Sequence, residues 1–453
     1  MFAALFALLA VRQLWLQVVA GPRLAASQYN PRHAQIAVGR GSILASDGSP
    51  LAVSHGARRV YPHGTLVAQA VGYASSRYGT SGLEDAFDSV LTAHTDAVDP
   101  LSQLRQILSG AQSAPRGADI VTTLDLSVQR ALVAGLSRYR RAAGVVLDPR
   151  TGAVLALASV PSYDPNQLDA SWSALVHDPA SPLLDRSTGG LYPPGSTFKI
   201  VTASDALDAN VVTPQSTFTD NGGFTVGNFT VHDDEEESTG TQDLAGAFAL
   251  SSNVDFAQIA LKIGVDTWFA YAAKWGLGQP VDFDLPVARD RLPAKKDVYA
   301  GILAQLGFGQ ASLLVTPMRM ALVGATIAHE GSTPRPYLVR RIAGSETTVA
   351  TTVETIAQPI SADTAHEVRA LMVQVVKRGT GTAAQLPGVT VAGKTGTATN
   401  PHGRSHAWFV AFAPAEAPRV AVAVVVENVG YGGTYAAPIA RAVLRVALAR
   451  QRT

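Results

Sequence analysis

A turn that delivers a serine onto the start of a helix is the feature that most constrains this chain. Pro193-Pro194-Gly195 precedes Ser196, and residues 201–209 contain no Pro or Gly, which predicts a helix there. Ser196 then lies in the first helical turn, and the spacing places Lys199 on the same face. A serine hydroxyl is a good nucleophile only when a neighbouring base takes its proton, and a lysine can be that base if burial and nearby charge lower its pKa. The sequence therefore predicts Ser196 as a nucleophile and Lys199 as its base.

Two further motifs strengthen this interpretation, because a Ser-x-x-Lys pair alone is expected about once by chance in a chain of this length. Ser251 and Asn253 form a Ser-x-Asn motif in a predicted loop, and Lys394-Thr395-Gly396-Thr397 lies on a predicted strand. Each motif alone is weak, whereas the ordered set of helix start, loop and strand is specific. The three segments together predict an acyl-transfer site.

Acyl transfer from a peptide requires a nucleophile, a proton shuttle to the leaving amine and donors for the oxyanion. Ser251 is the candidate that passes a proton to the leaving amine, and Asn253 can hold both Lys199 and the substrate amide. Lys394 keeps the local field positive, which favours a neutral Lys199 and an anionic substrate. The sequence leaves open which of these groups carries each proton.

The third motif also carries the groups that are expected to bind substrate. Thr395 and Thr397 offer hydroxyls to a terminal carboxylate, while Gly396 allows a substrate to approach the strand closely, as an added strand does. The backbone N–H groups of Ser196 and Thr397 are the candidate oxyanion hole. These residues predict recognition of a peptide that ends in a carboxylate.

Composition and charge exclude several other classes of protein. The 453 residues carry 36 basic and 35 acidic side chains, a formal net charge of +1, with no basic run interleaved with aromatics. We therefore expect no nucleic-acid partner. The absence of Cys excludes disulfides and thiolate metal sites. The acidic run 233–237 is interpreted as a solvated loop, because no second ligand group is placed near it by spacing. We expect no metal and no cofactor.

The distribution of strand and helix patterns predicts an α+β fold. Two early strands and three late strands are expected to form one five-stranded antiparallel sheet flanked by helices. The chain leaves this sheet to build a helical subdomain and then returns, so the site lies where the two parts meet. The expected strands are residues 143–147, 153–158, 389–397, 407–412 and 420–426, and the expected flanking helices are 127–140 and 437–449.

The first 117 residues are expected to be separate from the catalytic region. Residues 1–21 are mostly apolar and long enough to span a bilayer, so they are interpreted as a membrane anchor, with a cleaved signal peptide as the alternative. Residues 22–117 are expected to form a small accessory module, or pedestal, with a short helix over 102–108. A polar stretch broken by Pro and Gly ends this module, so the catalytic domain is expected to be 118–453.

From about Thr122 to its end, the chain resembles a class B (monofunctional) penicillin-binding protein, a peptidoglycan D,D-transpeptidase. The resemblance rests on the three motifs and on segments outside them. The compact size and Ala437-Pro438-Ile439 are most similar to the short actinobacterial branch associated with division. The further segments are 147–156, 161–166, 192–199, 307–310, 316–317, 379–382 and 406–409.

The resemblance implies the serine-acyltransferase fold of penicillin-binding proteins and β-lactamases. It implies an acyl-enzyme on Ser196, formed from the D-Ala-D-Ala end of peptidoglycan stem peptides, and acylation of the same residue by β-lactam antibiotics. It also implies a single transmembrane anchor with the catalytic domain outside the cytoplasm. The implied partners are a membrane glycosyltransferase or proteins of the division complex.

The N-terminal region departs from the family pattern. The usual pedestal entry, Arg-Gly-x-Ile-x-Asp-Arg-Asn-Gly, appears here as residues 40–48. This segment keeps the arginine, the isoleucine and both glycines but has Ala45 at the acidic position.

Two other classes of function stay open on the sequence alone. The same three motifs serve a D,D-carboxypeptidase or a β-lactamase-like hydrolase, in which water accepts the acyl group. A non-catalytic division scaffold or a β-lactam sensor would keep the fold without the reaction. Asn253, the anchor and the pedestal favour the transpeptidase, and the intact Ser196, Lys199, Ser251 and Lys394 argue against a scaffold.

Overall fold

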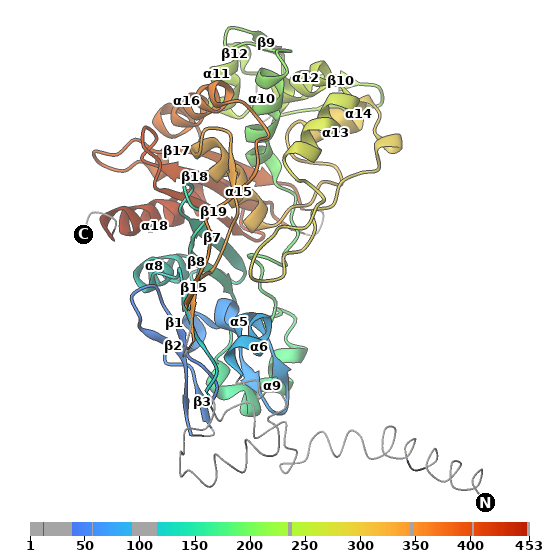
Figure 1. Cartoon of the computed structure of the whole chain (residues 1–453). Coiled ribbons are helices and arrows are strands. Elements are labelled where there is room, and N and C mark those ends of the chain that lie inside the picture. The colour runs from blue at the N-terminus through green and yellow to red at the C-terminus, as the bar shows by residue number, and fades with distance from the viewer. Residues whose placement is uncertain are drawn as a thin grey trace, which may run out of the picture.

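The structure, a computed structural model, describes residues 39–56, 58–92, 116–233, 238–344, 348–400 and 403–450, together with Arg12. A central sheet with flanking helices has a helical region at one end and a smaller N-terminal part at the other (Figure 1). Apart from Arg12, the anchor expected at 1–21 lies outside the described residues, as does the helix expected at 102–108. Within the described ranges, no helix is long and apolar enough to cross a membrane.

A five-stranded antiparallel sheet forms the centre of the catalytic region, which confirms the predicted fold class. Its strand order is β17-β18-β19-β7-β8, and the pairing of β19 with β7 joins the late strands to the early ones. All residues of β7, β18 and β19 are buried, which explains why these strands are continuous apolar runs. The strands are β7 (Ala142–Leu147), β8 (Val154–Val160), β17 (Ala392–Ala398), β18 (His406–Ala413) and β19 (Val420–Val426).

Helices cover both faces of this sheet. On one face α8 (Leu126–Leu136) packs against α18 (Ala437–Arg450), and their apolar side chains share a core with the strands. Gly135 permits the close approach of the two helices, since a Cβ there would lie 2.6 Å from Cγ2 of Ile439. The opposite face is covered by α15 (Pro317–Ala328), which is buried along its whole length. The sheet is therefore enclosed, and only its ends and edges are open to a substrate.

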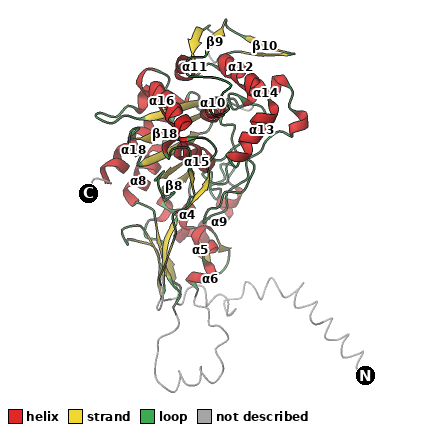
Figure 2. Cartoon of the chain, turned by 45° about the horizontal axis from the view of Figure 1, so that its top comes forward, coloured by secondary structure: helices red, strands yellow, loops and turns green. Residues whose placement is uncertain are grey.

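The helical region is built around α10 (Lys199–Asp208), whose residues 199–207 are all buried. Helices α12 and α16 pack directly against α10, and α11 packs on α16. Two small two-stranded antiparallel sheets, β9 with β12 and the hairpin of β10 with β11, lie at the outer edge of this region (Figure 2). The bounds are α11 (Leu244–Leu250), α12 (Asn253–Ile263), α13 (Val265–Lys274), α14 (Ala300–Leu306), α16 (Ala362–Arg378), β9 (Thr217–Asp220), β10 (Phe224–Val226), β11 (Phe229–Val231) and β12 (Gly240–Asp243).

A second sheet, of six strands, joins the N-terminal part to the catalytic region. Its order is β15-β14-β6-β1-β2-β3, and β6 pairs in parallel with β1 and antiparallel with β14. The sheet thus takes strands from both sides of residue 117, where a domain boundary is expected, and how the chain divides into domains stays a prediction. The strands are β1 (Ile43–Leu44), β2 (Pro50–His55), β3 (Arg58–Val60), β6 (Asp119–Thr122), β14 (Val339–Ala343) and β15 (Thr348–Ala350).

Short elements connect these parts. In the N-terminal part they are η2 (Gly64–Leu66), α4 (Ala68–Val71), β4 (Ala74–Ser75), β5 (Gly79–Thr80), α5 (Gly82–Ala86) and α6 (Asp88–Leu91). In the catalytic region they are η3 (Pro165–Gln167), α9 (Leu168–His177), η4 (Gly195–Phe198), η5 (Lys295–Asp297), β13 (Thr333–Pro334), β16 (Thr355–Ala357), η6 (Thr382–Ala384) and α17 (Gly432–Tyr435).

A buried ion-pair network holds the N-terminal part together. Glu84 accepts hydrogen bonds from Arg40 Nε at 2.6 Å and from Arg59 Nε at 2.7 Å, and the Glu84 side chain is fully buried. The Tyr61 hydroxyl donates to the same carboxylate at 3.2 Å. The arginine of the pedestal-entry pattern therefore has a structural role in this chain.

Replacing Glu84 by alanine is expected to lower the free energy of unfolding by about 3–5 kcal/mol, because buried Arg59 loses its counter-charge and buried Arg40 loses the buried one of its two carboxylate partners. Asp88→Ala is the matched control. Asp88 also pairs with Arg40, but its side chain is 52% exposed, so its loss is expected to cost less than about 1 kcal/mol. Urea unfolding of the purified chain measures the stability of both variants. An equal loss of unfolding free energy in the two variants would contradict the conclusion that Glu84 contributes most to the network.

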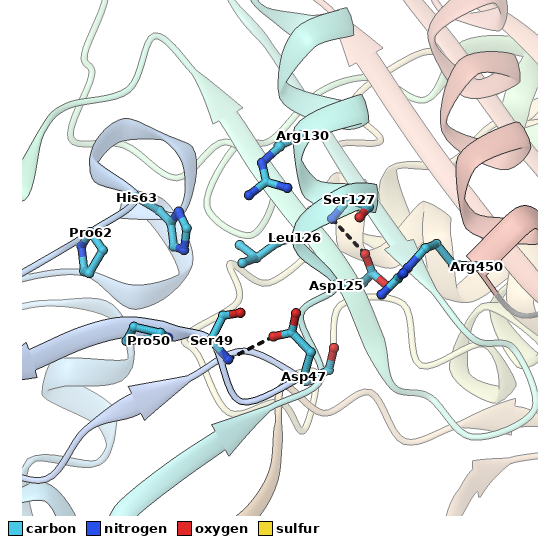
Figure 3. Close-up of a pocket in the computed structure, with 11 residues that line it drawn as sticks. Asp47, Ser49, Pro50, Pro62, His63, Asp125, Leu126, Ser127, Arg130 and Arg450 are labelled. Atoms are coloured by element: carbon cyan, nitrogen blue, oxygen red, sulfur yellow. Dashed lines mark hydrogen bonds and ion pairs between the residues drawn. The ribbon is translucent and has the colours of Figure 1, made fainter. Parts of the chain in front are cut away.

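A cavity of about 290 Å³ lies where the N-terminal part meets the catalytic region (Figure 3). It is lined by Asp47 and His63 from the N-terminal part, by Asp125 and Arg130 at the start of α8, and by Arg450 at the end of α18. Asp125 pairs with Arg450 at 3.3 Å. Burial lowers the pKa of His63, and the charge of Arg130 lowers it further. None of the lining residues belongs to the three motifs, so this cavity is distinct from the predicted site.

Candidate active site

The turn before Ser196 is fixed by close backbone contacts. Ser196 lies in η4, a 3-10 turn, and Lys199 is the first residue of the α-helix that follows. Gly195 has φ +52°, and a Cβ on it would lie 2.8 Å from the carbonyl oxygen of Thr397. Glycine is therefore required where the turn passes against the third motif. This contact brings the segment that carries Ser196 directly against Thr397.

Two segments outside the motifs support the same turn. The Gly195 N–H donates to the carbonyl of Gly309 at 2.9 Å. Gly309 has φ +74°, and a Cβ on it would lie 2.2 Å from the Gly195 carbonyl oxygen. On the other side, the Trp408 indole N–H donates to the Pro193 carbonyl at 3.0 Å. The segments 307–310 and 406–409, which carry part of the family resemblance, thus hold the nucleophile turn in place.

Lys199 is fully buried and ties the first motif to the second. Its Nζ donates to the Asn253 side-chain oxygen at 2.9 Å and lies 3.3 Å from the Ser251 hydroxyl. It also donates to the Ser251 carbonyl and lies 5.4 Å from the centre of the Phe256 ring. The amine is therefore held by three oxygen atoms of one short segment.

Lys394 ties the third motif to the same hydroxyl. Its Nζ donates to Ser251 Oγ at 2.7 Å, and the side chain is fully buried. The Phe248 ring lies 5.6 Å from this amine. The Ser251 hydroxyl thus stands between two lysines, one from the helix that carries the nucleophile and one from β17.

Ser251 adopts an unusual backbone conformation. It is the C-cap of α11, with φ +68° and ψ +32°, in the left-handed region. Residues other than glycine adopt this conformation at a cost, and such residues cluster at functional sites. Ser252 then begins α12, because its side chain accepts the Asp255 N–H at 3.0 Å. A two-residue connection therefore ends one helix, begins the next and aims the Ser251 hydroxyl at both lysines.

The third motif lies on β17, the edge strand of the five-stranded sheet. An edge strand can accept an extended peptide as an added strand. The Thr395 hydroxyl lies 2.5 Å from the hydroxyl of Thr380, which follows the end of α16. A Cβ on Gly396 would lie 2.9 Å from Cγ2 of Thr197. Gly396 is therefore required because a side chain there would collide with the turn that carries Ser196. This reason adds to the one given by the sequence analysis, in which the glycine lets a substrate approach the strand.

The structure brings the sequence-predicted residues of all three motifs into one site. They are Ser196, Lys199, Ser251, Asn253, Lys394, Thr395, Gly396 and Thr397. The contributors that were not predicted include Gly309, Thr380, Trp408 and Asp233. Gly309 and Thr380 belong to segments that carry the family resemblance, which is the signal that could have identified them.

Asp233 belongs to the acidic run that the sequence analysis interprets as a solvated loop. Its carboxylate instead accepts the backbone N–H groups of Asn253 and Val254. Residues 234–237 of the run lie outside the described ranges. Among the residues that are described, no group of three or more His, Cys, Asp or Glu is arranged to hold a metal ion.

The chain matches two protein-family descriptions. Residues 142–445 match the penicillin binding protein transpeptidase domain, and residues 40–120 match the penicillin binding protein A dimerisation domain. The chain belongs to the penicillin-binding protein transpeptidases. The first match contains all three motifs of the site, and the second covers most of the N-terminal part of this penicillin-binding protein.

Mycobacterial proteins are among the similar relatives of this penicillin-binding protein. Peptidoglycan D,D-transpeptidase PbpA of Mycolicibacterium smegmatis is 36% identical, over 94% of this chain and 91% of that protein. PbpA of Mycobacterium tuberculosis is 37% identical, over 86% of this chain and 84% of that protein. The structure of M. tuberculosis penicillin-binding protein A as a penicillin G acyl-enzyme complex is 35% identical, covers 90% of this chain and 99% of that chain, and has a TM-score of 0.82. The expected similarity to an actinobacterial branch is confirmed.

Proposed function

We propose that this penicillin-binding protein is a peptidoglycan D,D-transpeptidase that works through an acyl-enzyme on Ser196. The observation that carries the proposal is the Ser251 hydroxyl, which lies within hydrogen-bond distance of two buried lysines, Lys199 and Lys394. A hydroxyl that accepts two N–H donors has its own proton available for a third group. This arrangement supplies a base for the nucleophile and an acid for the leaving group within one hydrogen-bonded cluster.

The first half-reaction forms the acyl-enzyme. The Ser196 hydroxyl attacks the carbonyl carbon of the D-Ala-D-Ala amide while neutral Lys199 accepts its proton. The N–H groups of Ser196 and Thr397 stabilise the oxyanion of the tetrahedral intermediate. The proton then reaches the leaving nitrogen through Ser251, the C–N bond breaks, and D-Ala departs with a restored amine.

The second half-reaction transfers the acyl group to a neighbouring stem peptide. The amine of that stem attacks the Ser196 ester, and the lysine–serine cluster takes the proton that the amine loses. The C–O bond of the ester breaks, the proton returns to the Ser196 oxygen, and the new amide links two stems. In a D,D-carboxypeptidase or another hydrolase, water would replace the amine in this step.

Substrate binding is assigned to β17. The hydroxyls of Thr395 and Thr397 hold the carboxylate of the terminal D-Ala, and Lys394 adds positive charge below them. The stem peptide lies as an extended strand along the open edge of β17. β-Lactam antibiotics acylate Ser196 in the same place, because their ring amide and carboxylate occupy the positions of the D-Ala-D-Ala amide and its terminal carboxylate.

We further propose that residues 1–21 anchor the protein by a single pass in the cell membrane, with the catalytic region outside the cytoplasm. The length and apolar character of this segment support the anchor. The N-terminal part would then contact a membrane glycosyltransferase or proteins of the division complex. The similarity of residues 40–120 to a dimerisation domain supports a role of this part in association.

Incubation of the purified chain with a fluorescent penicillin, followed by intact mass and peptide mapping, tests the proposal. We expect a stable adduct on Ser196 that is absent in Ser196→Ala. With a stem pentapeptide and a D-amino acid, we expect release of D-Ala together with an amide product. Turnover of penicillin without a lasting adduct would indicate a hydrolase. Folded protein that forms no adduct and releases no D-Ala would indicate a scaffold.

A further inference from the structure

Asp233 supplies a helix cap from a distant segment. It follows β11, and its Oδ1 accepts the N–H of Asn253 and, at 3.2 Å, the N–H of Val254. These are the first two residues of α12. The first N–H groups of a helix have no partner within the helix, and a carboxylate is a favourable partner for them. The carboxylate of Asp233 therefore holds the backbone of the second motif at Asn253.

The side chain of Asn253 is held from the same segment and from Lys199. Its amide nitrogen donates to the His232 carbonyl at 3.2 Å, and its amide oxygen accepts from Lys199 Nζ at 2.9 Å. The backbone N–H and the amide N–H of Asn253 thus both point to residues 232–233. The amide oxygen is left directed at the base of the proposed reaction.

We propose that Asp233 is a positioning residue for acylation, which fixes Asn253 and, through its amide oxygen, the amine of Lys199. This inference rests on the proposed acyl-enzyme at Ser196. Asp233 is not assigned any contact with substrate. Its effect passes through the backbone of Asn253 to the amine that takes the proton of Ser196.

Helix α12 has a cap of its own, which separates positioning from folding. Ser252 is its N-cap, and the Ser252 side chain accepts the Asp255 N–H at 3.0 Å. Loss of one cap typically costs about 1 kcal/mol, and the helix keeps the other. Helix α12 can therefore form without Asp233. The main effect of the bonds to Asp233 is to fix the position of Asn253, the first residue of α12, which contacts Lys199.

Among the described residues, the charges that face Asp233 come from three elements. They are Lys199 from α10, Asp220 from β9 and Asp255 on α12, with His232 adjacent in the chain. Burial raises the pKa of Asp233, while the charge of Lys199 and the two N–H groups oppose the rise. Burial, with the charges of Asp233 and Asp220, raises the pKa of Asp255 to about 6. Variants of Asp233 must therefore separate its role as an acceptor from its role as a charge.

Asp233→Ala and Asp233→Asn make this separation. Alanine removes the acceptor and the charge, whereas asparagine keeps an acceptor oxygen and removes the charge. Acylation by a fluorescent penicillin is measured from pH 5 to pH 9, with active-site titration to count competent protein. We expect Asp233→Ala to lower the acylation rate constant by about 10–100-fold, the range for loss of hydrogen bonds to a charged group. The dissociation constant of the non-covalent penicillin complex is expected to change little.

Asp233→Asn is expected to keep most of the acylation rate at high pH. The acid limb of its pH profile is expected to move to lower pH, because a negative charge near an amine stabilises the protonated form. Asp125→Ala is the matched control, since Asp125 caps α8 by accepting the N–H of Ser127 (Figure 3) and the N–H of Val128. This control should lower the urea midpoint without changing the rate of acylation per active site.

The proposal fails if Asp233→Ala acylates as fast as wild type per active site. It also fails if Asp233→Asn is as slow as Asp233→Ala at every pH, because the charge and not the acceptor would then be responsible. These outcomes differ from failure of the proposed function, in which the wild-type chain itself would form no adduct on Ser196.

Discussion

Replacing Lys199 by methionine is expected to slow the acylation of Ser196 by about 10²–10⁴-fold, the usual contribution of a positioned general base. Methionine keeps the length and the apolar stem of this fully buried side chain but has no amine. The Ser196 hydroxyl would then have to lose its proton to water or to Ser251. The second-order rate constant for a fluorescent penicillin measures the effect directly.

Two comparisons make the result for Lys199 specific. Lys262→Met, on the exposed side of α12, removes an amine without touching the site and should acylate normally. The loss in Lys199→Met should persist across the accessible pH range, because methionine has no amine at the position that contacts Asn253, whatever the pH. If Lys199→Met acylated at a rate close to wild type, Lys199 could not be the base, and Lys394 would take its place in the mechanism.

The catalytic sheet could be predicted because its strands carry their signal locally. Residues 142–147 and 420–426 are continuous apolar runs, and both strands are buried on both faces in the structure. The place of Ser196 could also be predicted, since a glycine turn followed by a helical segment leaves few conformations for the residues between them. Local sequence was sufficient wherever a residue's role depended on its near neighbours.

The N-terminal sheet could not be predicted in the same way. Strand β1 has only two residues. Strand β6 lies between β1 and β14 and pairs with each of them. Strand pairing between segments more than 200 residues apart leaves no local pattern, because the partners are chosen by tertiary packing. The expected boundary after residue 117 relied on composition. Composition does not reveal that β14, from the catalytic region, pairs with β6 in the N-terminal sheet.

The contributors to the site that escaped prediction share one property. Asp233 and Thr380 act through contacts with segments distant in the chain, the first with α12 and the second with β17. An acidic run is usually a solvated loop, so composition alone gives the wrong interpretation of Asp233. The role of such residues depends on which loop folds back over the site, and only the assembled fold provides that information.

Substitution of Ser251 is expected to have the second large effect. Its two variants are expected to share one loss of acylation rate but to differ in their free energy of unfolding. Ser251→Ala and Ser251→Gly both remove the hydroxyl shared by Lys199 and Lys394. Both variants are therefore expected to lose about 10²-fold or more in acylation rate, as expected for loss of a proton-transfer group. The two variants share this defect, so any difference between them reports on the backbone at this position.

That difference should appear in the free energy of unfolding. The backbone of Ser251 has φ +68°, a left-handed conformation that alanine adopts at a cost and glycine adopts readily. Ser251→Gly is therefore expected to be about 1 kcal/mol more stable than Ser251→Ala, while remaining equally slow. Urea unfolding and penicillin acylation of the two proteins measure both quantities. Equal free energies of unfolding would show that the backbone strain at Ser251 is absent in solution. Normal acylation by Ser251→Gly would show that the Ser251 hydroxyl takes no part in the mechanism.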